Sequence, residues 1–424
     1  MVLATKSVEQ PQSGRDFILE GKPIDKAMCK AGILLCCVML CLCNWTSSSI
    51  LILREVEEKI LSFVKTPYRG FFVDIGPTVG DADKIWTISM NTDSEEEPLV
   101  LLHGLGAGVA LWVLNLDSFA KYRPVYAMDV LGFGRSSRPT FSKDPLISEK
   151  QLVKSVEEWR RKMNINRMVL LGHSMGGFIA SSYALSYPER VSHLILADPW
   201  GFPEMPADLL TTKPLWQRAL VNAIKPLNPL WPLRAAGPFG QWMLQKTRAD
   251  IAHKFKTAVE DNTKVIPQYI HQCNVQKPSG ESAFHAMMAL FGWAKYPMEH
   301  RLKDLRVDIP ITFIYGSESW MDSSSGETIK AHRVDSIVDI KMVDGAGHHV
   351  YADKADIFNR YVNEACELYK ASATNIDVRD TTKSDKEVND GTLQTETQQI
   401  TVHRDQNSEH TLSDGQHTMG LQQA

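Results

Sequence analysis

The stretch MVLLGHSMGG, residues Met168 to Gly177, is the most informative part of this sequence. A continuous apolar run, which predicts a buried strand, leads directly into a Gly-x-Ser-x-Gly turn and then into a predicted helix. Gly172 and Gly176 give such a turn room where a Cβ would clash. The turn lifts the Ser174 hydroxyl off the strand, beside a helix N-terminus whose amides stabilise developing negative charge. We therefore predict that Ser174 is a catalytic nucleophile.

Short buried runs alternate with helical stretches on both sides of this turn. This rhythm predicts a mostly parallel sheet with helices on both faces, and with the nucleophile turn it predicts an α/β-hydrolase fold. Earlier in the chain, Glu55–Val64 reads as a short amphipathic helix and Lys84–Met90 alternates like a strand. The predicted buried strands are Leu99–Leu102, Val125–Asp129, Met168–Gly172, Leu194–Asp198, Ile311–Tyr315 and Ile340–Val343, and the predicted helices include Glu149–Met163, Gly176–Ser186 and Lys354–Lys370.

One long interval, about residues 200–308, interrupts the alternation. It is rich in proline and tryptophan, and a connection of this length inside a domain usually has a function of its own. We predict a mostly helical lid over the active site. Its Trp, Phe and Met content suits a wall for an acyl chain or a surface that contacts lipid, and equally a cap that only shapes the pocket.

The oxyanion hole is predicted from the turn after the first buried strand. Acyl transfer needs two preorganised N–H donors for the tetrahedral oxyanion. One is expected from the amide of Met175, the residue after the nucleophile, and the other from Leu105 in the His103-Gly104-Leu105-Gly106 turn.

The base is predicted at His348, in the run from Gly345 to His349 that follows the last strand. Nucleophile, acid and histidine occur in that chain order in this fold, so the base belongs late in the sequence. His349 is its neighbour and is expected to point elsewhere.

The acid has three candidates, because several carboxylates follow strands near the carboxyl edge. Asp322 is favoured, since it follows the strand Ile311–Tyr315, and Glu318 in the same loop is the next choice. Asp198, at the end of the preceding strand, is the third. Asp322 alternatively caps the helix predicted to begin near residues 323–326.

Composition limits the remaining function classes. The chain has 424 residues, ordinary globular composition and a formal net charge of −4, which gives no global attraction to nucleic acid. Five of the seven cysteines lie between Cys29 and Cys43, which argues against a disulfide framework and for a reducing compartment. No His or acidic residue is interleaved with them in metal-ligand spacing, and we expect no metal or other cofactor.

The terminal segments differ from the predicted hydrolase domain, residues 54–370. Residues 1–27 and 371–424 are polar and are predicted to be disordered. The apolar run Ala31–Cys43 lies between the N-terminal segment and the domain. As a helix it rises about 20 Å, which is less than the thickness of a hydrocarbon core of about 30 Å. Residues 28–53 are therefore read as a monotopic or hairpin anchor in a membrane or lipid droplet, with a signal sequence or a buried helix as the alternatives.

Taken together, these motifs resemble the alpha/beta-hydrolase-domain four/five subfamily of lipid enzymes, from about Ile50 to Leu368. The matching stretches are Leu99–Gly104, Leu131–Pro139, Asp198–Pro203, Gly237–Gly240, Cys273–Gln276, Pro278–Glu281, Gly292–Lys295, Gly345–His348 and Val350–Asp353.

The resemblance implies lipid chemistry. One branch is similar to a lipase that removes acyl chains from N-acyl phosphatidylethanolamines and their lyso forms. The other coactivates a triacylglycerol lipase on lipid droplets and carries Asn at the nucleophile position, so Ser174 favours an active hydrolase. The resemblance places the family acid at Asp322 and a proposed acyltransferase motif, His-x4-Asp, at His348 and Asp353. Asp353 is otherwise an N-terminal helix residue.

The expected function is that of a serine-dependent acylhydrolase, a phospholipase or lysophospholipase acting on glycerophospholipids. The alternatives are a lysophosphatidic acid acyltransferase and a lipid-droplet coactivator of a triacylglycerol lipase. The expected partners are the lipid substrate, a membrane or lipid-droplet surface, and a lipase or droplet-coat protein. We expect the protein on the cytoplasmic face of the endoplasmic reticulum, mitochondria or lipid droplets, with Ala31–Leu53 in the contact.

Overall fold

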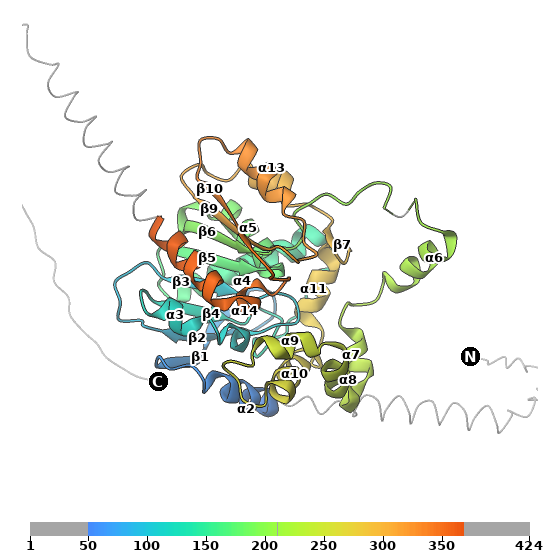
Figure 1. Ribbon diagram of the computed structural model, residues 1–424, viewed down its shortest axis with the longest axis horizontal. Helices are drawn as coiled ribbons and strands as arrows, with labels where there is room; N and C mark the ends of the chain where they lie inside the picture. Colours follow the sequence, from blue (N-terminus) through green and yellow to red (C-terminus); the bar gives the residue numbers. More distant parts are fainter. Residues whose placement is uncertain (1–49, 210, 369–424) are drawn as a thin grey trace, which may run out of the picture. The chain divides into compact units, whose positions relative to one another are not determined.

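The computed structural model describes residues 50–209 and 211–368 (Figure 1). The segments predicted to be disordered, 1–27 and 371–424, and the apolar run Ala31–Cys43 lie outside the described residues. Within residues 50–209 and 211–368, no helix combines the length and the apolar character needed to cross a membrane.

An eight-stranded sheet forms the centre of the domain, in the order β1-β2-β4-β3-β5-β6-β9-β10. The first two strands are antiparallel to their neighbours, and all later pairs are parallel. The strands are β1 Tyr68–Gly76, β2 Asp83–Met90, β3 Leu99–Leu102, β4 Val125–Met128, β5 Met168–His173, β6 Val191–Ala197, β9 Ile311–Gly316 and β10 Val338–Val343. The predicted mostly parallel sheet is therefore present.

The strand β1 was missed in the sequence. Its residues pair along β2 from Tyr68 opposite Met90 to Gly76 opposite Asp83. It is an edge strand, and one of its two faces is exposed to solvent. Phe72 on that face is 46% exposed, whereas Val73 on the opposite face is buried. Apolar residues at neighbouring positions, with a glycine at position 70, conceal the period of two that identifies a half-buried strand.

Helices cover both faces of the sheet because the strands are apolar on both sides. Leu99 and Leu101 of β3 belong to one hydrophobic cluster, and Val100 and Leu102 belong to the other. The first cluster includes α3 (Leu116–Ala120) and a helix at residues 355–368; the second includes α4 (Pro145–Lys162), α5 (Met175–Ser186) and α13 (Ser324–His332) (Figure 1). Alternate strand residues thus hold two helical layers.

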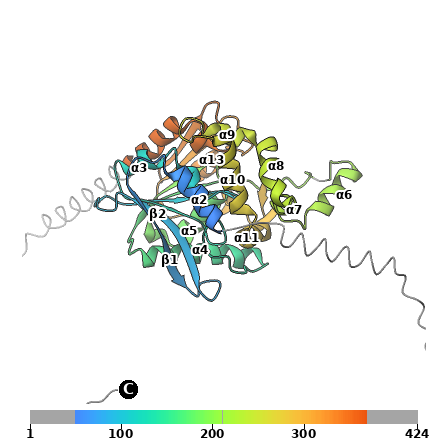
Figure 2. The same ribbon diagram turned by 90° about the horizontal axis from the view of Figure 1, so that it is seen from below.

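The helix α2, Ile50–Leu61, packs onto the domain beside α10 (Figure 2). It begins five residues before the predicted amphipathic helix, and its first turn is the carboxyl end of the predicted anchor, residues 50–53. Leu53 and Ile60 are fully buried in the core, whereas Leu51 is 64% exposed. Residues 53–61 are therefore part of the hydrolase domain.

Helices form most of the regular structure in the interval between β6 and β9, where the sequence analysis expects a lid. Its contacts fasten it to the domain: α10 lies against α2 and α8, and α11 lies against α4. Its elements are α6 Leu215–Ile224, α7 Trp231–Ala235, α8 Gly240–Thr247, α9 Ala249–Lys254, α10 Asn262–Asn274, α11 Ser279–Met287, the hairpin strands β7 Met288–Leu290 and β8 Trp293–Ala294, and α12 Glu299–Leu302.

Candidate active site

Ser174 lies at a strained turn between β5 and α5. Its backbone has φ 53° and ψ −118°, a conformation that L residues rarely adopt and that is retained at functional sites. A Cβ at Gly172 would lie 2.3 Å from the carbonyl oxygen of Gly176, and one at Gly176 would lie 2.3 Å from that of Leu102. Both glycines are therefore required, and the predicted nucleophile turn is present.

His348 connects this serine to a buried carboxylate. Its Nε2 lies 3.0 Å from Ser174 Oγ, and its Nδ1 lies 2.6 Å from Oδ2 of Asp198. A carboxylate only accepts, so Nδ1 carries the proton and Nε2 presents a lone pair to the serine hydroxyl. The structure thus brings together the predicted nucleophile and the predicted base within hydrogen-bonding distance.

The acid beside His348 is Asp198, which corrects the prediction of Asp322. Asp198 is fully buried, directly after β6, with φ 46°. Its carboxylate also accepts from the amide of Gly316, at 3.3 Å, and from the Ser319 hydroxyl. Because β6 lies beside β5, the residue that directly follows β6 lies close to the turn that carries Ser174. The carboxylate of Asp198 therefore reaches His348 without a long loop.

Both carboxylates predicted after β9 are exposed instead. Asp322 accepts from the amide of Ser324, 2.9 Å away, at the start of α13, but the N-cap of that helix is Ser323, so Asp322 lies one residue before the predicted capping position. The amide of Glu318 donates to the carbonyl oxygen of Ala346. The structure gives neither side chain a contact with His348, whose Nδ1 is already bound.

The two predicted oxyanion donors lie on adjacent segments. Met175 is the first residue of α5, so its amide points out of the helix N-terminus. Leu105 follows Gly104, where a Cβ would lie 3.1 Å from Ser174 Cβ. Within residues 50–209 and 211–368, neither amide donates a hydrogen bond. The two donors therefore remain available near the serine.

A buried histidine pair, which the sequence analysis did not single out, holds both active-site turns. The Nε2 of His173 lies 2.9 Å from the carbonyl oxygen of His348, and His103 Nδ1 lies 2.8 Å from the carbonyl oxygen of Gly104. Burial lowers the pKa of both imidazoles, and the nearby His348 lowers that of His173 further. Both rings are thus neutral hydrogen-bonding groups. Each immediately precedes a motif glycine or serine, which is the signal that was available in the sequence.

Asp353 does not face His348. Its carboxylate forms an ion pair with Lys254, 2.7 Å from Nζ, and accepts from the amide of Gly347 at 3.0 Å. It therefore ties the loop that carries the histidine to α9, which lies in the interval between β6 and β9. The structure does not bring His348 and Asp353 together as a base–acid pair.

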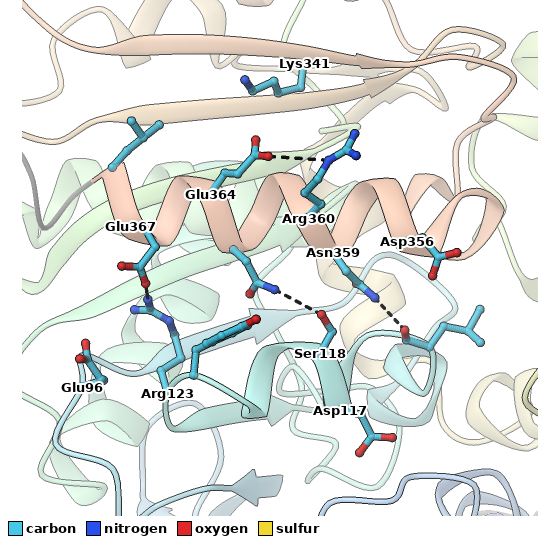
Figure 3. Close-up of a pocket in the computed structure, with 14 residues that line it drawn as sticks. Glu96, Asp117, Ser118, Arg123, Lys341, Asp356, Asn359, Arg360, Glu364 and Glu367 are labelled. Atoms are coloured by element: carbon cyan, nitrogen blue, oxygen red, sulfur yellow. Dashed lines mark hydrogen bonds and ion pairs between the residues drawn. The ribbon is translucent and has the colours of Figure 1, made fainter.

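A cavity of about 1360 Å³ lies between α3 and the helix at 355–368 (Figure 3). Its walls carry paired polar groups: Arg123 binds Glu367 at 2.9 Å, and Asn363 binds Ser118 at 3.2 Å. Neither Ser174 nor His348 lines it, so its chemistry is separate from that of the candidate active site.

The sheet order, with the serine turn after β5 and the histidine after β10, defines an α/β hydrolase. Comparison with known proteins agrees: residues 97–355 match the model of the alpha/beta hydrolase fold family. Solved structures with the same fold include a membrane phospholipase A, with a TM-score of 0.52 and 20% identity over 82% of this chain and 99% of that one. Carboxylesterase CesB from Bacillus subtilis has a TM-score of 0.52 and 16% identity over 74% and 96%. At these identities the likeness concerns the fold alone.

Sequence relatives narrow the assignment. The mouse (lyso)-N-acylphosphatidylethanolamine lipase is 47% identical over 317 residues, 74% of this chain and 91% of the relative. The pig 1-acylglycerol-3-phosphate O-acyltransferase ABHD5 is 48% identical over 319 residues, 74% and 89%. The chain belongs to the alpha/beta hydrolase fold family, in the subfamily of these two proteins. The predicted fold and family resemblance are confirmed.

Proposed function

We propose that this protein is a serine-dependent acylhydrolase of glycerophospholipids, such as N-acyl phosphatidylethanolamines and their lyso forms. The observation that carries the proposal is the continuous hydrogen-bonded series from Ser174 through His348 to Asp198. The substrate class is supported by the relatives whose names are (lyso)-N-acylphosphatidylethanolamine lipases.

The mechanism uses this series in two steps. Ser174 Oγ attacks the ester carbonyl carbon while its proton passes to Nε2 of His348, and the amides of Met175 and Leu105 bind the resulting oxyanion. His348 returns the proton to the departing glycerol oxygen, and an acyl-serine remains. A water molecule then loses a proton to His348, attacks the acyl-serine and releases the fatty acid with Ser174 regenerated. Asp198 stabilises the imidazolium in both steps.

The proposal is tested with purified full-length protein and its Ser174→Ala variant on a mixed lipid extract, with products read by mass spectrometry. Wild type is expected to release fatty acids and lyso or deacylated phospholipids, and the variant is not. Ser324→Ala, at an exposed hydroxyl outside the site, is the matched control. Equal rates for wild type and Ser174→Ala contradict the proposal.

A second candidate is acyl transfer to lysophosphatidic acid, which the names of the ABHD5 relatives support. Because Asp353 is paired with Lys254, we propose that any transfer uses the same acyl-serine, with the lysophosphatidic acid hydroxyl in place of water. Ser174→Ala is then expected to lose both activities. A variant that retains transfer from acyl-CoA points to a serine-independent route.

We also propose that the lid meets the lipid surface that holds the substrate. Trp216 on α6 and Trp242 on α8 are 66% and 59% exposed, and Phe239 is 65% exposed. Residues 211–257 contain eight Lys or Arg and one acidic residue. Exposed aromatic side chains beside cations suit the interface of a membrane that carries anionic lipids. We place this surface on the cytoplasmic face of a membrane or lipid droplet, where a lipase or droplet-coat protein remains a proposed partner.

A further inference from the structure

An apolar groove of about 860 Å³ lies between the end of α6 with the following turn and the β7–β8 hairpin. Its lining includes Val221, Leu227, Trp231, Leu290, Phe291 and Trp293. The volume falls within the range of about 300–1,000 Å³ that is usual for small-molecule sites. Leu227 and Trp231 are 40% and 44% exposed, so the groove leaves apolar surface without cover from the described residues.

Two polar side chains of the lining, those of His285 and Lys295, hold its walls together. The imidazole of His285 lies 2.8 Å from the carbonyl oxygen of Lys225, which joins α11 to the end of α6. Lys295 donates to the carbonyl oxygen of Ala286 at 2.7 Å. These bonds leave a groove whose free surface is mainly hydrocarbon. Its chemistry fits an aliphatic chain rather than a charged headgroup.

Two aromatic rings connect the groove to the catalytic histidine. Phe291, in the hairpin turn, stacks on Trp320 with ring centroids 5.7 Å apart, and the Trp320 ring lies 5.1 Å from that of His348. Trp200 donates to the carbonyl oxygen of Phe291 at 2.7 Å and so fixes the turn. Phe291 and Trp320 are 55% and 52% exposed, which makes the connection an open apolar track.

We propose that this track and groove bind the acyl chain of the ester held at Ser174, and that Ala289 in the groove wall limits the chain length. The inference rests on the proposed acyl-ester hydrolysis and adds the place of the chain. The Phe291 ring lies at most about 11 Å from that of His348. An extended chain advances about 1.3 Å per carbon, given a C–C bond of about 1.52 Å, so about eight carbons reach Phe291. A longer chain continues into the groove.

The first test is a series of p-nitrophenyl esters from butyrate to palmitate, hydrolysed by full-length wild type and Ala289→Phe. The added ring narrows the groove, and Ala219→Phe places the same ring on an exposed position of α6 outside it. We expect Ala289→Phe to lower kcat/KM for palmitate about tenfold or more, because about two methylenes that lose burial already correspond to that factor. Butyrate hydrolysis is expected to stay unchanged, as is the whole profile of Ala219→Phe.

The second test needs no turnover. In the Ser174→Ala background, a brominated C18 lysophosphatidylcholine is expected to quench tryptophan fluorescence, because Trp231 and Trp293 line the groove. Adding Ala289→Phe, which leaves the tryptophans unchanged, is expected to reduce this quenching, and the part that remains is expected to come from Trp320 on the track. Val221→Phe narrows the groove from α6 and replaces Ala289→Phe if the latter fails to hydrolyse butyrate or to fold.

The two tests separate the two proposals. An unchanged palmitate-to-butyrate ratio and unchanged quenching in the narrowed variants overturn the acyl-chain inference, and leave the groove to another occupant such as a protein segment. Ester hydrolysis that survives Ser174→Ala overturns the proposed function, while the quenching result still decides whether the groove binds the chain.

Discussion

Asp198 Oδ2 lies 2.6 Å from Nδ1 of His348, and the carboxylate is fully buried at the end of the strand beside the nucleophile. A buried carboxylate in this position fixes the imidazole tautomer and stabilises its charged form during the reaction. The two later carboxylates, at Asp322 and Glu318, are exposed, and that of Asp322 accepts from the amide of Ser324.

Asp198→Asn is therefore expected to lower kcat for ester hydrolysis by about 10³- to 10⁴-fold, because an amide stabilises the wrong tautomer and leaves the imidazolium unpaired. Asp322→Asn, the matched control after β9, is expected to leave kcat unchanged. Steady-state hydrolysis of p-nitrophenyl butyrate measures both. A large loss in Asp322→Asn with a small loss in Asp198→Asn contradicts the assignment.

The pairing of Asp353 with Lys254 predicts that the two residues act as a unit. Asp353→Asn and Lys254→Met each remove the ion pair that ties the histidine loop to α9. Because the carboxylate acts by holding this loop, both variants are expected to lower kcat by similar factors, about two- to tenfold, with little change in KM. If His348 and Asp353 instead formed a catalytic pair, Asp353→Asn would lose far more acyltransferase activity than Lys254→Met. The transfer of an acyl group from acyl-CoA to lysophosphatidic acid measures this difference.

A substitution at Gly104 tests whether the turn that carries Leu105 supplies an oxyanion donor. A Cβ there would lie 2.8 Å from Nδ1 of His173 and 3.1 Å from Cβ of Ser174, so Gly104→Ala must displace the turn that carries Leu105. Loss of one oxyanion donor typically lowers kcat by about 10²- to 10³-fold. Gly292→Ala, whose Cβ meets only the Trp320 ring at 3.6 Å, is the control, and both variants are assayed with p-nitrophenyl butyrate, whose chain is too short to enter the groove that Gly292 lines. The kcat of Gly292→Ala is expected to change little. A Gly104→Ala protein that folds normally and retains kcat excludes Leu105 as a donor.

The inner strands of the sheet could be predicted from the sequence because they are apolar on both faces. Leu99–Leu102 is buried at every position, and the predicted strand there has the observed bounds. The edge strand β1 lacked this signal, since it faces solvent on one side and Phe71 and Phe72 occupy neighbouring positions.

The part of the site that depends on a fixed local sequence motif could be predicted from the sequence. The turn around Ser174 requires glycines at two specified positions, so its position followed from the sequence. The acid has no fixed sequence motif, because a carboxylate at the end of any strand near His348 can accept the hydrogen bond from Nδ1. The positive φ of Asp198 is a property of the folded backbone and leaves no mark in a single sequence.

Buried neutral histidines make the folded state sensitive to acid. His193 on β6 is fully buried against Thr312, and burial lowers its pKa to about 4 from 6.5. Below pH 6.5 the imidazole of His193 is protonated in the unfolded chain but stays neutral in the folded chain. The free energy of unfolding therefore falls as the pH falls, until about pH 4. Between pH 7.5 and pH 5 this residue alone is expected to lower the free energy of unfolding by about 2 kcal/mol.

Urea unfolding at the two pH values measures this effect. His193→Gln removes the titrating group, so the difference between pH 7.5 and pH 5 is expected to shrink by about 2 kcal/mol, whatever the variant costs at either pH. His332→Gln, at an exposed position, is expected to leave the difference unchanged. An undiminished pH dependence in His193→Gln shows that other groups account for the acid sensitivity.

The lid tryptophans predict how the protein binds membranes. Trp216 and Trp242 are more than half exposed in a basic stretch, so the double variant Trp216→Ala/Trp242→Ala removes large apolar surfaces from the proposed interface. Each Trp can bury about 150–250 Å², and partial insertion of two is expected to strengthen the binding of wild type to anionic phospholipid vesicles about tenfold or more over the variant. Sedimentation with vesicles measures this binding, and raised salt is expected to weaken it because cations contribute. Tyr122→Ala, which removes an exposed aromatic ring after α3, is the control. If the double variant binds vesicles as wild type does while hydrolysing p-nitrophenyl butyrate normally, the lid is not the contact and the segment before α2 becomes the candidate.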